Sequence, residues 1–447
     1  MTSFAPGPMA PDVAPPATAP PAVAVHAGEL IAIDTTNTGG AGTMGEHLAA
    51  TYVADQLASV GGDPVLISAE PGRTNVILRI PGRTEGAGIV VHGHLDVVPA
   101  DRQEWSVDPF AGLIADGFVW GRGAVDMKGA DAVMMTVAQQ WLRSGIRPRH
   151  DVVFAWVADE ETGGRLGAGH LTAEHPELFA GCNTAIGEVG GFGLPLGGGR
   201  TLYPIMTGER SQARVRLTAR GQSGHASVRS TANPIAALAA AIGELANHTF
   251  EVTATDSIED FLQGFSQLWR IDRTGLSLEQ FLARIGPLRH LVEPALRSCA
   301  TPTTLRAGTA TNVAPREAVA DFDCRVLPGG LAEFAAGLPS IVGDGVEIDV
   351  EPRSAGFSTP FDGPVVDAMI AALLASDPGA LVLPYMVSAS TDAPHFAGLG
   401  MRTFGFTPLL LPMGFAFGRM FHGADERVPV SGLTFGVEVL DRFLVSF

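Results

Sequence analysis

The 447-residue chain has a single lysine, Lys128, and only three cysteines, Cys182, Cys299 and Cys324. The cysteines are far apart, odd in number and without C-x-x-C spacing, so they predict neither a disulfide framework nor a thiolate zinc site, and a reducing, cytoplasmic compartment fits. No apolar run reaches the length of a membrane span, and the N-terminus lacks the basic and apolar regions of a secretory leader. The formal net charge of −18 argues against binding to nucleic acid or to an anionic membrane surface.

Length and composition predict two globular domains, because 447 residues exceed one ordinary core and hydrophobic residues make up 46% of the chain. Residues 1–24 are rich in proline and alanine and are expected to form a disordered lead-in. Residues 25–210 and 353–447 alternate strands with helices, which predicts an α/β domain with a mainly parallel sheet covered by helices. Residues 211–352 contain strands that alternate charged and apolar positions, which predicts an inserted α+β domain with two helices on one face of an antiparallel sheet.

Two local patterns make further predictions. Thr43 and Glu46 have capping-box spacing, which predicts a helix that begins there and runs to Gly61. Residues 253–307 are too long for a plain connection and carry apolar residues at helical spacing, which predicts extra helices. Their apolar side chains could face a hydrophobic substrate or belong to a core.

Imidazoles and carboxylates accumulate where predicted strands end. Ligands bind at the carboxyl ends of strands in open α/β sheets, so we expect these groups to meet in one crevice. Several acids in one crevice would repel one another, and bound divalent cations would offset that repulsion. Two histidines with carboxylates form a ligand set suited to zinc. The residues are His94 and Asp96 after one strand, Asp126 in a glycine-rich loop, Glu160 and Glu161 after another strand, Glu188, and His422 near the C-terminus.

Seven motifs occur in an order that resembles a known family. They are HGHLDVVP, GRGAVDMKG, ADEETGG, AIGEVG, GQSGHAS, TNVAPREAVADFDCRV and HGADERV. From about residue 26 to its end, the chain resembles the co-catalytic zinc peptidases and amidohydrolases, which include aminoacylase, glutamate carboxypeptidase, acetylornithine deacetylase and succinyl-diaminopimelate desuccinylase.

The resemblance implies two divalent metal ions per chain, most often zinc, with cobalt or manganese as alternatives. His94 and Glu188 would hold one ion, Glu161 and His422 would hold the other, and Asp126 would bridge the two.

The resemblance also implies how the catalytic groups act. Glu160 would be the general base that takes a proton from the bridging water and passes it to the leaving nitrogen. Asp96 would orient His94, and the peptide bond between Asp126 and Met127 would be cis.

In the inserted domain the resemblance implies an oxyanion donor and a substrate clamp. His225 would stabilise the tetrahedral oxyanion by reaching into the site of a partner subunit in a homodimer. Asn312 and Arg325 would hold the substrate's carboxylate or carbonyl. Taken alone, His225 could instead be a residue at a helix start, and Arg325, which alternates with Asp323, could simply form a cross-strand ion pair.

The predicted activity is hydrolysis of the amide bond of N-acyl-L-amino acids or of small peptides with a free carboxylate. The ending and the long insertion are similar to the larger-lid branch with Gly-Xaa carboxypeptidase and N-fatty-acyl-amino-acid hydrolases. The alternatives are a dipeptidase, a deacetylase or desuccinylase of biosynthesis, and a barrel amidohydrolase using His92 and His94. A catalytically inactive binding protein on the same fold is the non-enzyme alternative, although every predicted catalytic position is filled.

Overall fold

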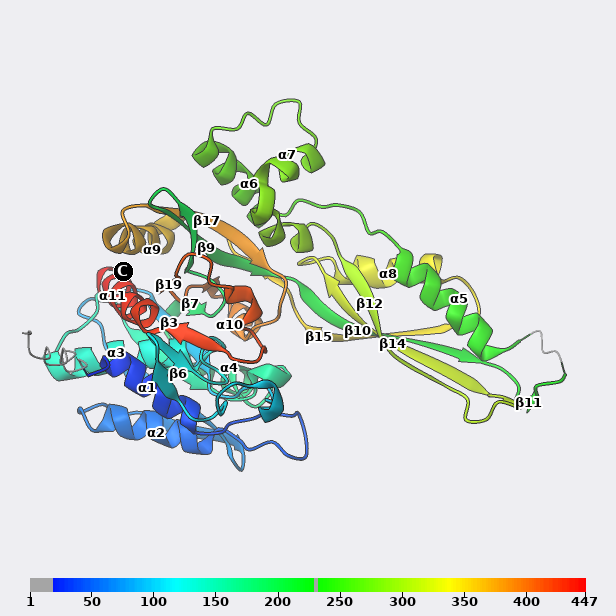
Figure 1. Ribbon diagram of the computed structural model, residues 1–447, viewed down its shortest axis with the longest axis horizontal. Coiled ribbons are helices and arrows are strands. Elements are labelled where there is room, and N and C mark those ends of the chain that lie inside the picture. The colour runs from blue at the N-terminus through cyan, green and yellow to red at the C-terminus, as the bar shows by residue number, and fades with distance from the viewer. Residues whose placement is uncertain (1–18, 229–231) are drawn as a thin grey trace, which may run out of the picture.

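The computed structural model describes residues 19–228 and 232–447 and divides into a larger α/β domain and an elongated inserted domain (Figure 1). The larger domain is built on an 11-stranded mixed sheet in which β6, β3, β7 and β18 run parallel to one another. Its order is β1 (Val65–Glu70), β2 (Arg73–Ile80), β6 (Val152–Val157), β3 (Gly88–His94), β7 (Cys182–Gly187), β18 (Arg402–Gly405), β9 (Arg200–Glu209), β8 (Phe192–Gly197) and β19 (Leu409–Leu410), with β16 (Phe357–Ser358) and β17 (Ala380–Val387) also paired to β9.

Helices cover both faces of this sheet, because the central strands carry apolar side chains on both of their faces. Phe154 and Trp156 of β6 join the core beneath one helical layer, whereas Val153 and Ala155 join a separate core on the opposite face. The first layer contains α1 (Ala22–Ala32), α2 (His47–Ala58), α3 (Lys128–Ser144), α9 (Gly363–Ser376) and α11 (Val430–Ser446). The second contains α4 (Ala168–Glu174) and α10 (Ala393–Gly398). A small sheet of β4 (Leu113–Ala115), β5 (Phe118–Trp120) and β20 (Arg427–Pro429) lies beside them.

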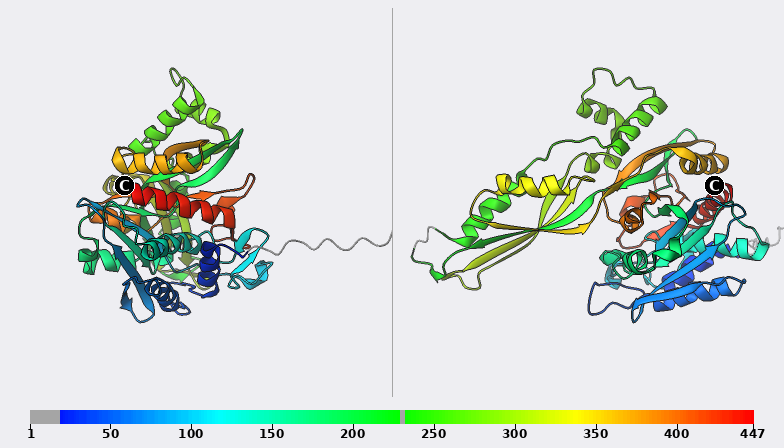
Figure 2. Two further views of the ribbon diagram at one scale, coloured as in Figure 1. Left: turned by 90° about the vertical axis from the view of Figure 1, so that its left-hand side faces the viewer. Right: turned by 180° about the vertical axis from the view of Figure 1, so that it is seen from behind.

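The inserted domain, called the lid below, matches the predicted α+β pattern. Its antiparallel sheet has the order β12 (Cys299–Ala307), β14 (Glu317–Val326), β10 (Ser211–Arg220) and β15 (Glu347–Ser354). Helices α5 (Pro234–Asn247) and α8 (Leu331–Val342) pack on one face of it, as Figures 1 and 2 show. The short strands β11 (Gly224–His225) and β13 (Val313–Ala314) pair at the end of the lid that lies away from the larger domain.

Residues 253–307 form the expected extra helices, and those helices pack on the larger domain. They are α6 (Asp256–Trp269) and α7 (Leu278–Ile285), followed by the 3-10 turns Gly286–Leu291 and Glu293–Ala295. Phe261, Phe265 and Phe281 share a core with Leu383 and Tyr385 of β17, and Figure 1 shows both helices over β17 and β9. These apolar side chains are therefore core residues and do not form a substrate wall.

The predicted end of the disordered lead-in and the predicted capping box are both wrong. Residues 1–18 of the expected lead-in lie outside the described residues, but α1 begins at Ala22, and Val23 and Ala24 are buried in its first turn. Proline is tolerated at a helix start and alanine favours helix, so composition alone misplaced this boundary. Glu46 does not complete a capping box with Thr43, because its carboxylate accepts two hydrogen bonds from a guanidinium of β2.

No helix among the described residues is both long and apolar enough to cross a membrane.

The core position of α6 predicts an unequal response on its two faces. Replacing buried Phe265 with alanine should lower the free energy of unfolding by about 3–5 kcal/mol, because it removes a ring from a packed core. Leu268→Ala on the same helix, where the side chain is 38% exposed, should cost only about 0.5 kcal/mol. Urea denaturation followed by tryptophan fluorescence compares the two, and equal losses would contradict this packing.

Candidate metal centre

The carboxylate of Asp126 lies between two imidazoles that are distant from it in the sequence. Its Oδ1 is 3.0 Å from His94 Nε2, and its Oδ2 is 3.2 Å from His422 Nε2. His94 is the last residue of β3, and His422 lies in the loop before β20. Asp126 lies just before α3 and is joined to the next residue, Met127, by a cis peptide bond. The cis bond is the one that the resemblance implies.

Each imidazole also faces a glutamate from the carboxyl end of a strand. Glu161 Oε2 is 3.3 Å from His422 Nε2, and Glu188 Oε2 is 3.8 Å from His94 Nε2. Because β3, β6 and β7 are parallel, the residues that follow them meet at the same edge of the sheet. The structure thus brings together all five residues predicted as metal ligands, in two pairs on either side of Asp126.

Glu160 lies beside this cluster. Its Oε2 is 3.9 Å from His94 Nε2, and ligand atoms of Glu160, Glu188 and His94 lie within 4.8 Å of one another. Burial raises the pKa of Glu160 well above its ordinary value, and the neighbouring Glu188 carboxylate raises it further. Burial also raises the pKa of Glu188 to about 7.

The pKa values of both imidazoles are raised as well. Hydrogen bonds to Asp126 and Glu161 raise the pKa of His422 to about 10. Burial works to lower the pKa of His94, but its contacts with Asp126, Asp96 and Glu188 outweigh burial and raise that pKa well above the ordinary value. The carboxylates of the cluster therefore favour protonated imidazoles and attract cations.

A pair of divalent cations fits these residues. Glu161 Oε1 is buried without a hydrogen-bond partner among the described residues, so it can act as a ligand. His94 Nδ1 lies 3.0 Å from the main-chain oxygen of Asp96, so the Nδ1–H donates there and Nε2 offers its lone pair to the cluster. Imidazole nitrogen and carboxylate oxygen are the donors that zinc prefers.

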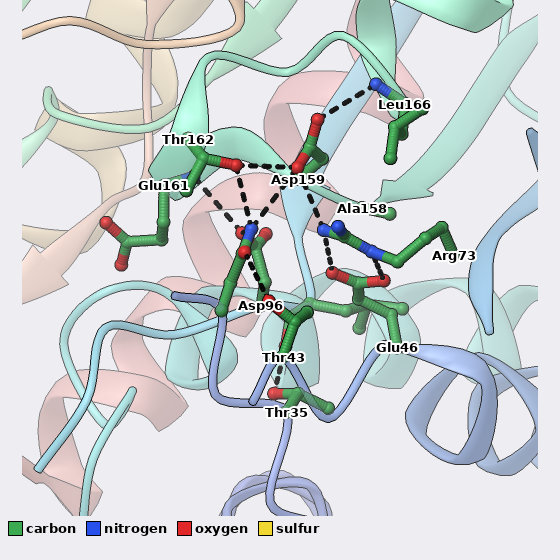
Figure 3. Close-up of polar contacts among 12 residues, drawn as sticks. Thr35, Thr43, Glu46, Arg73, Asp96, Ala158, Asp159, Glu161, Thr162 and Leu166 are labelled. Carbon is green, nitrogen blue, oxygen red and sulfur yellow. Dashed lines mark hydrogen bonds and ion pairs between the residues drawn. The ribbon is translucent and has the colours of Figure 1, made fainter. Parts of the chain in front are cut away.

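The turn that carries Glu160 and Glu161 is held by its backbone. The N–H of Glu160 donates to Asp96 Oδ1 and the N–H of Glu161 donates to Asp96 Oδ2, each at 3.1 Å. Asn37 Nδ2 also donates to Asp96 Oδ2 at 2.9 Å. Asp96 was predicted only to orient His94, and its carboxylate fixes this turn as well, as Figure 3 shows in part.

A buried ion-pair network supports the same turn from the other side. Asp159, at φ +73°, accepts hydrogen bonds from Arg73 Nη2 at 2.9 Å and from the N–H of Leu166 at 3.0 Å. Arg73 forms two further bonds to Glu46, both at 2.7 Å (Figure 3). Sequence reasoning assigned Glu46 to a helix cap and did not connect it with Arg73 or with this turn, because no local motif links positions so far apart in the chain.

A cleft of about 1,710 Å³ separates the metal cluster from the lid. Glu160, Glu161 and His422 line one wall, and the polar face of the lid sheet forms the other. Arg325 lies on that facing wall, where it pairs with Asp323 at 3.1 Å and donates to Ser390 Oγ of the larger domain at 2.8 Å. Asp323 lies two residues before Arg325 on the same strand, β14, so this pair is not the cross-strand ion pair considered from the sequence. Arg325 borders the cleft.

His225 and Asn312 lie elsewhere. Both are exposed at the far end of the lid, where the N–H of Ala226 donates to the carbonyl of Asn312 at 2.9 Å. Neither lines the cleft in the described part of the chain. Figure 1 shows β11, which contains His225, far from the strand ends that carry the metal cluster. Within one chain, the structure thus does not bring these two predicted residues to the site.

Two other residues have structural positions. His92 is buried, stacks on Phe396 with ring centroids 4.5 Å apart, and burial lowers its pKa to about 3. Lys128 Nζ donates to the carbonyls of Leu30 and Ile33 at the end of α1, so it ties two helices together. The open mixed sheet and this lysine position exclude the barrel amidohydrolase alternative.

Comparison with known proteins places these residues in context. The sequence profile of peptidase family M20/M25/M40 matches residues 90–446. The chain is 26% identical to pig (Sus scrofa) aminoacylase-1 over 416 residues, 89% of each chain. It is 26% identical to a probable carboxypeptidase S-like 2 of Dictyostelium discoideum over 378 residues, 76% of this chain and 68% of that protein.

Solved structures share the fold. An M20 family metallo-carboxypeptidase from Sulfolobus solfataricus superposes with a TM-score of 0.71 at 19% identity, over 94% of this chain and 98% of that one. A dinuclear metal binding peptidase from Bacillus subtilis superposes with a TM-score of 0.60 at 14% identity, over 95% of this chain and 97% of that one.

The network behind the Glu160 turn predicts a difference between two arginines of β2. Arg73→Gln leaves Glu46 and Asp159 buried without their cation and should lower the free energy of unfolding by about 3–5 kcal/mol. Arg79→Gln, which breaks a half-exposed pair with Asp151, should cost about 1 kcal/mol or less. Denaturant midpoints of the two variants measure this difference, and a mild effect of Arg73→Gln would argue against a supporting network.

Proposed function

The chain belongs to peptidase family M20/M25/M40 and is a metallohydrolase acting on amide bonds, and we propose that its substrates are N-acyl-L-amino acids or small peptides with a free carboxylate. The observation that carries the proposal is the Asp126 carboxylate between His94 and His422, with Glu160 beside it and Arg325 on the facing wall of the cleft.

We propose that the cluster holds two divalent cations and that these are zinc, with cobalt or manganese as alternatives. His94 and Glu188 would hold one cation and Glu161 and His422 the other, with Asp126 shared between them. When bound, the cations polarise the scissile carbonyl and lower the pKa of water. His94 and His422 contact opposite oxygens of Asp126, and this supports the division. Each imidazole also has its own glutamate, Glu188 beside His94 and Glu161 beside His422.

Glu160 is the proposed general base. It takes a proton from the attacking water and delivers it to the leaving nitrogen, so that the carbonyl carbon gains an oxygen as the C–N bond breaks. Its side chain forms no hydrogen bond among the described residues, which leaves the carboxylate available for this transfer. The bonds from the backbone of the turn to Asp96 hold Glu160 beside the cluster.

Arg325 is the proposed anchor for the substrate's carboxylate, because it faces the cluster across the cleft and can form two parallel hydrogen bonds. The lid wall around it is polar and charged, and the apolar residues of α6 and α7 are occupied in a core. We therefore favour short acyl groups and short peptides over long fatty-acyl chains.

We further propose that the protein is a homodimer in the cytoplasm and that His225 and Asn312 complete the site of the partner subunit. β12 is an edge strand of the lid sheet, and Leu305 on it is 64% exposed, so this edge is open to pairing with a second chain. His225 Nδ1 accepts the N–H of Ser227 at 3.2 Å, so the ring proton lies on Nε2, where it can be donated to an oxyanion. The free cysteines fit a reducing compartment.

A substrate panel tests the proposal. Zinc-loaded protein should hydrolyse N-acetyl-L-amino acids or dipeptides faster than long-chain N-acyl-amino acids, N-acetylornithine and N-succinyl-diaminopimelate. Methyl esters of the preferred substrate should show a raised KM, and Arg325→Ala should raise KM for the free acid but not for the ester. A preference for the biosynthetic substrates would favour the deacetylase or desuccinylase alternative, and no hydrolysis of any amide would reject the proposal.

Glu160→Gln should abolish turnover while two metal ions remain bound, because the amide cannot accept the proton. Steady-state kinetics with metal analysis by mass spectrometry give both readouts. Glu70→Gln, at the exposed rim of the same cleft, is the matched control and should keep activity. Activity of Glu160→Gln within tenfold of the native protein would show that another group is the base.

A mixing experiment tests the role of His225. His225→Ala alone should lower kcat by about 10²–10³-fold if the imidazole donates to the oxyanion. Mixed with Glu160→Gln, it should recover part of the activity, because one site of each heterodimer would combine an intact base with an intact histidine. Differently tagged subunits allow the heterodimer to be isolated, and an inactive heterodimer would exclude action across the interface.

A further inference from the structure

Glu426 is a fully buried acid that follows the His422 loop and is bound almost entirely by the loop that carries Asp126. Its Oε1 accepts the N–H groups of Val125 and Asp126 at 2.7 and 3.1 Å. Its Oε2 accepts the N–H of Gly123 at 3.0 Å and Nη1 of Arg122 at 2.6 Å. All four donors come from residues about 300 positions earlier in the chain, so this carboxylate joins two segments that are distant in the sequence and adjacent in the fold.

Arg122 extends the same connection to His422. Its Nη1 binds Glu426, and its Nη2 donates to the main-chain oxygen of His422 at 3.2 Å. The guanidinium also lies over the ring of Trp105, 5.3 Å from the centroid, which limits its rotation. The Arg122 guanidinium therefore binds both Glu426, which holds the Asp126 loop, and the backbone of His422.

His422 needs such support more than His94 does. The side chain of His422 is 55% exposed and its backbone is at φ +57°, whereas His94 is buried at the end of a central strand. Apart from Asp126 and Glu161, the described contacts that hold His422 in place come from its backbone.

We propose that Glu426 and Arg122 are positioning residues that set the distance between Asp126 and His422. They thereby determine how tightly, and in what geometry, a metal ion is held between these two ligands. The inference rests on the proposed function, in which both residues are metal ligands. Groups that support metal ligands from behind commonly change metal affinity by about 10–100-fold when they are replaced.

Glu426→Gln keeps the shape of the side chain but replaces one acceptor oxygen with an amide that faces backbone N–H donors. The Kd of the more weakly held zinc ion should rise by about 10–100-fold, measured in the full chain by competition with a chromophoric chelator. The visible absorption of the cobalt-loaded variant should change, and kcat should fall with little change in KM. Glu209→Gln is the matched control, since Glu209 is equally buried and accepts two bonds from Thr391, and it should bind zinc as the native protein does.

Arg122→Lys provides a second test if Glu426→Gln does not fold. Lysine keeps the positive charge beside Glu426 but lacks the fork that also reaches His422, so the same loss of zinc affinity is expected. Native protein that binds two zinc ions, together with folded variants whose zinc affinity and cobalt spectrum match it, would overturn the inference and leave the proposed function intact. Native protein that binds fewer than two zinc ions would overturn the proposed function and this inference with it.

Discussion

The concentration of negative charge around Asp126 is the constraint on which the rest of the site depends. One carboxylate lies within 3.2 Å of two imidazoles, and three glutamates of the same cluster add charge in a buried environment. Such a cluster is unfavourable unless positive charge is close, because burial weakens solvation of every carboxylate in it. A pair of divalent cations meets this requirement with the ligand types that are present.

The side chains of the cluster come partly from the ends of parallel strands and partly from loops. The parallel strands β3, β6 and β7 bring His94, the Glu160 turn and Glu188 to one edge of the sheet. Asp126 and His422, the other two proposed ligands, lie in loops that long-range hydrogen bonds hold in place, since Glu426 binds the Asp126 loop and Arg122 binds the backbone of His422. The proposed substrate anchor, Arg325, lies on the polar face of the lid, so in this proposal catalysis depends on how the lid lies relative to the larger domain.

Much of the fold and the cluster follows from local sequence patterns. Apolar runs predicted the buried strands, and the ordered motifs, through their resemblance to a known family, predicted Asp126 and the four residues that meet around it. What local patterns missed was set by tertiary contacts. Glu46 has capping-box spacing but pairs with Arg73, and the apolar residues of α6 pack on β17 instead of in the lid. Glu426 stands four residues after the predicted ligand His422 in HGADERV, yet only the folded chain reveals its partners, which are the Arg122 guanidinium and the N–H groups of Gly123, Val125 and Asp126.

Anomalous diffraction from zinc-soaked crystals tests the central claim most directly. The account predicts two zinc peaks per chain, about 3.5–4 Å apart on either side of the Asp126 carboxylate. One peak should lie beside His94 and Glu188 and the other beside His422 and Glu161. Zinc peaks away from these residues, or none at saturating zinc, would contradict it.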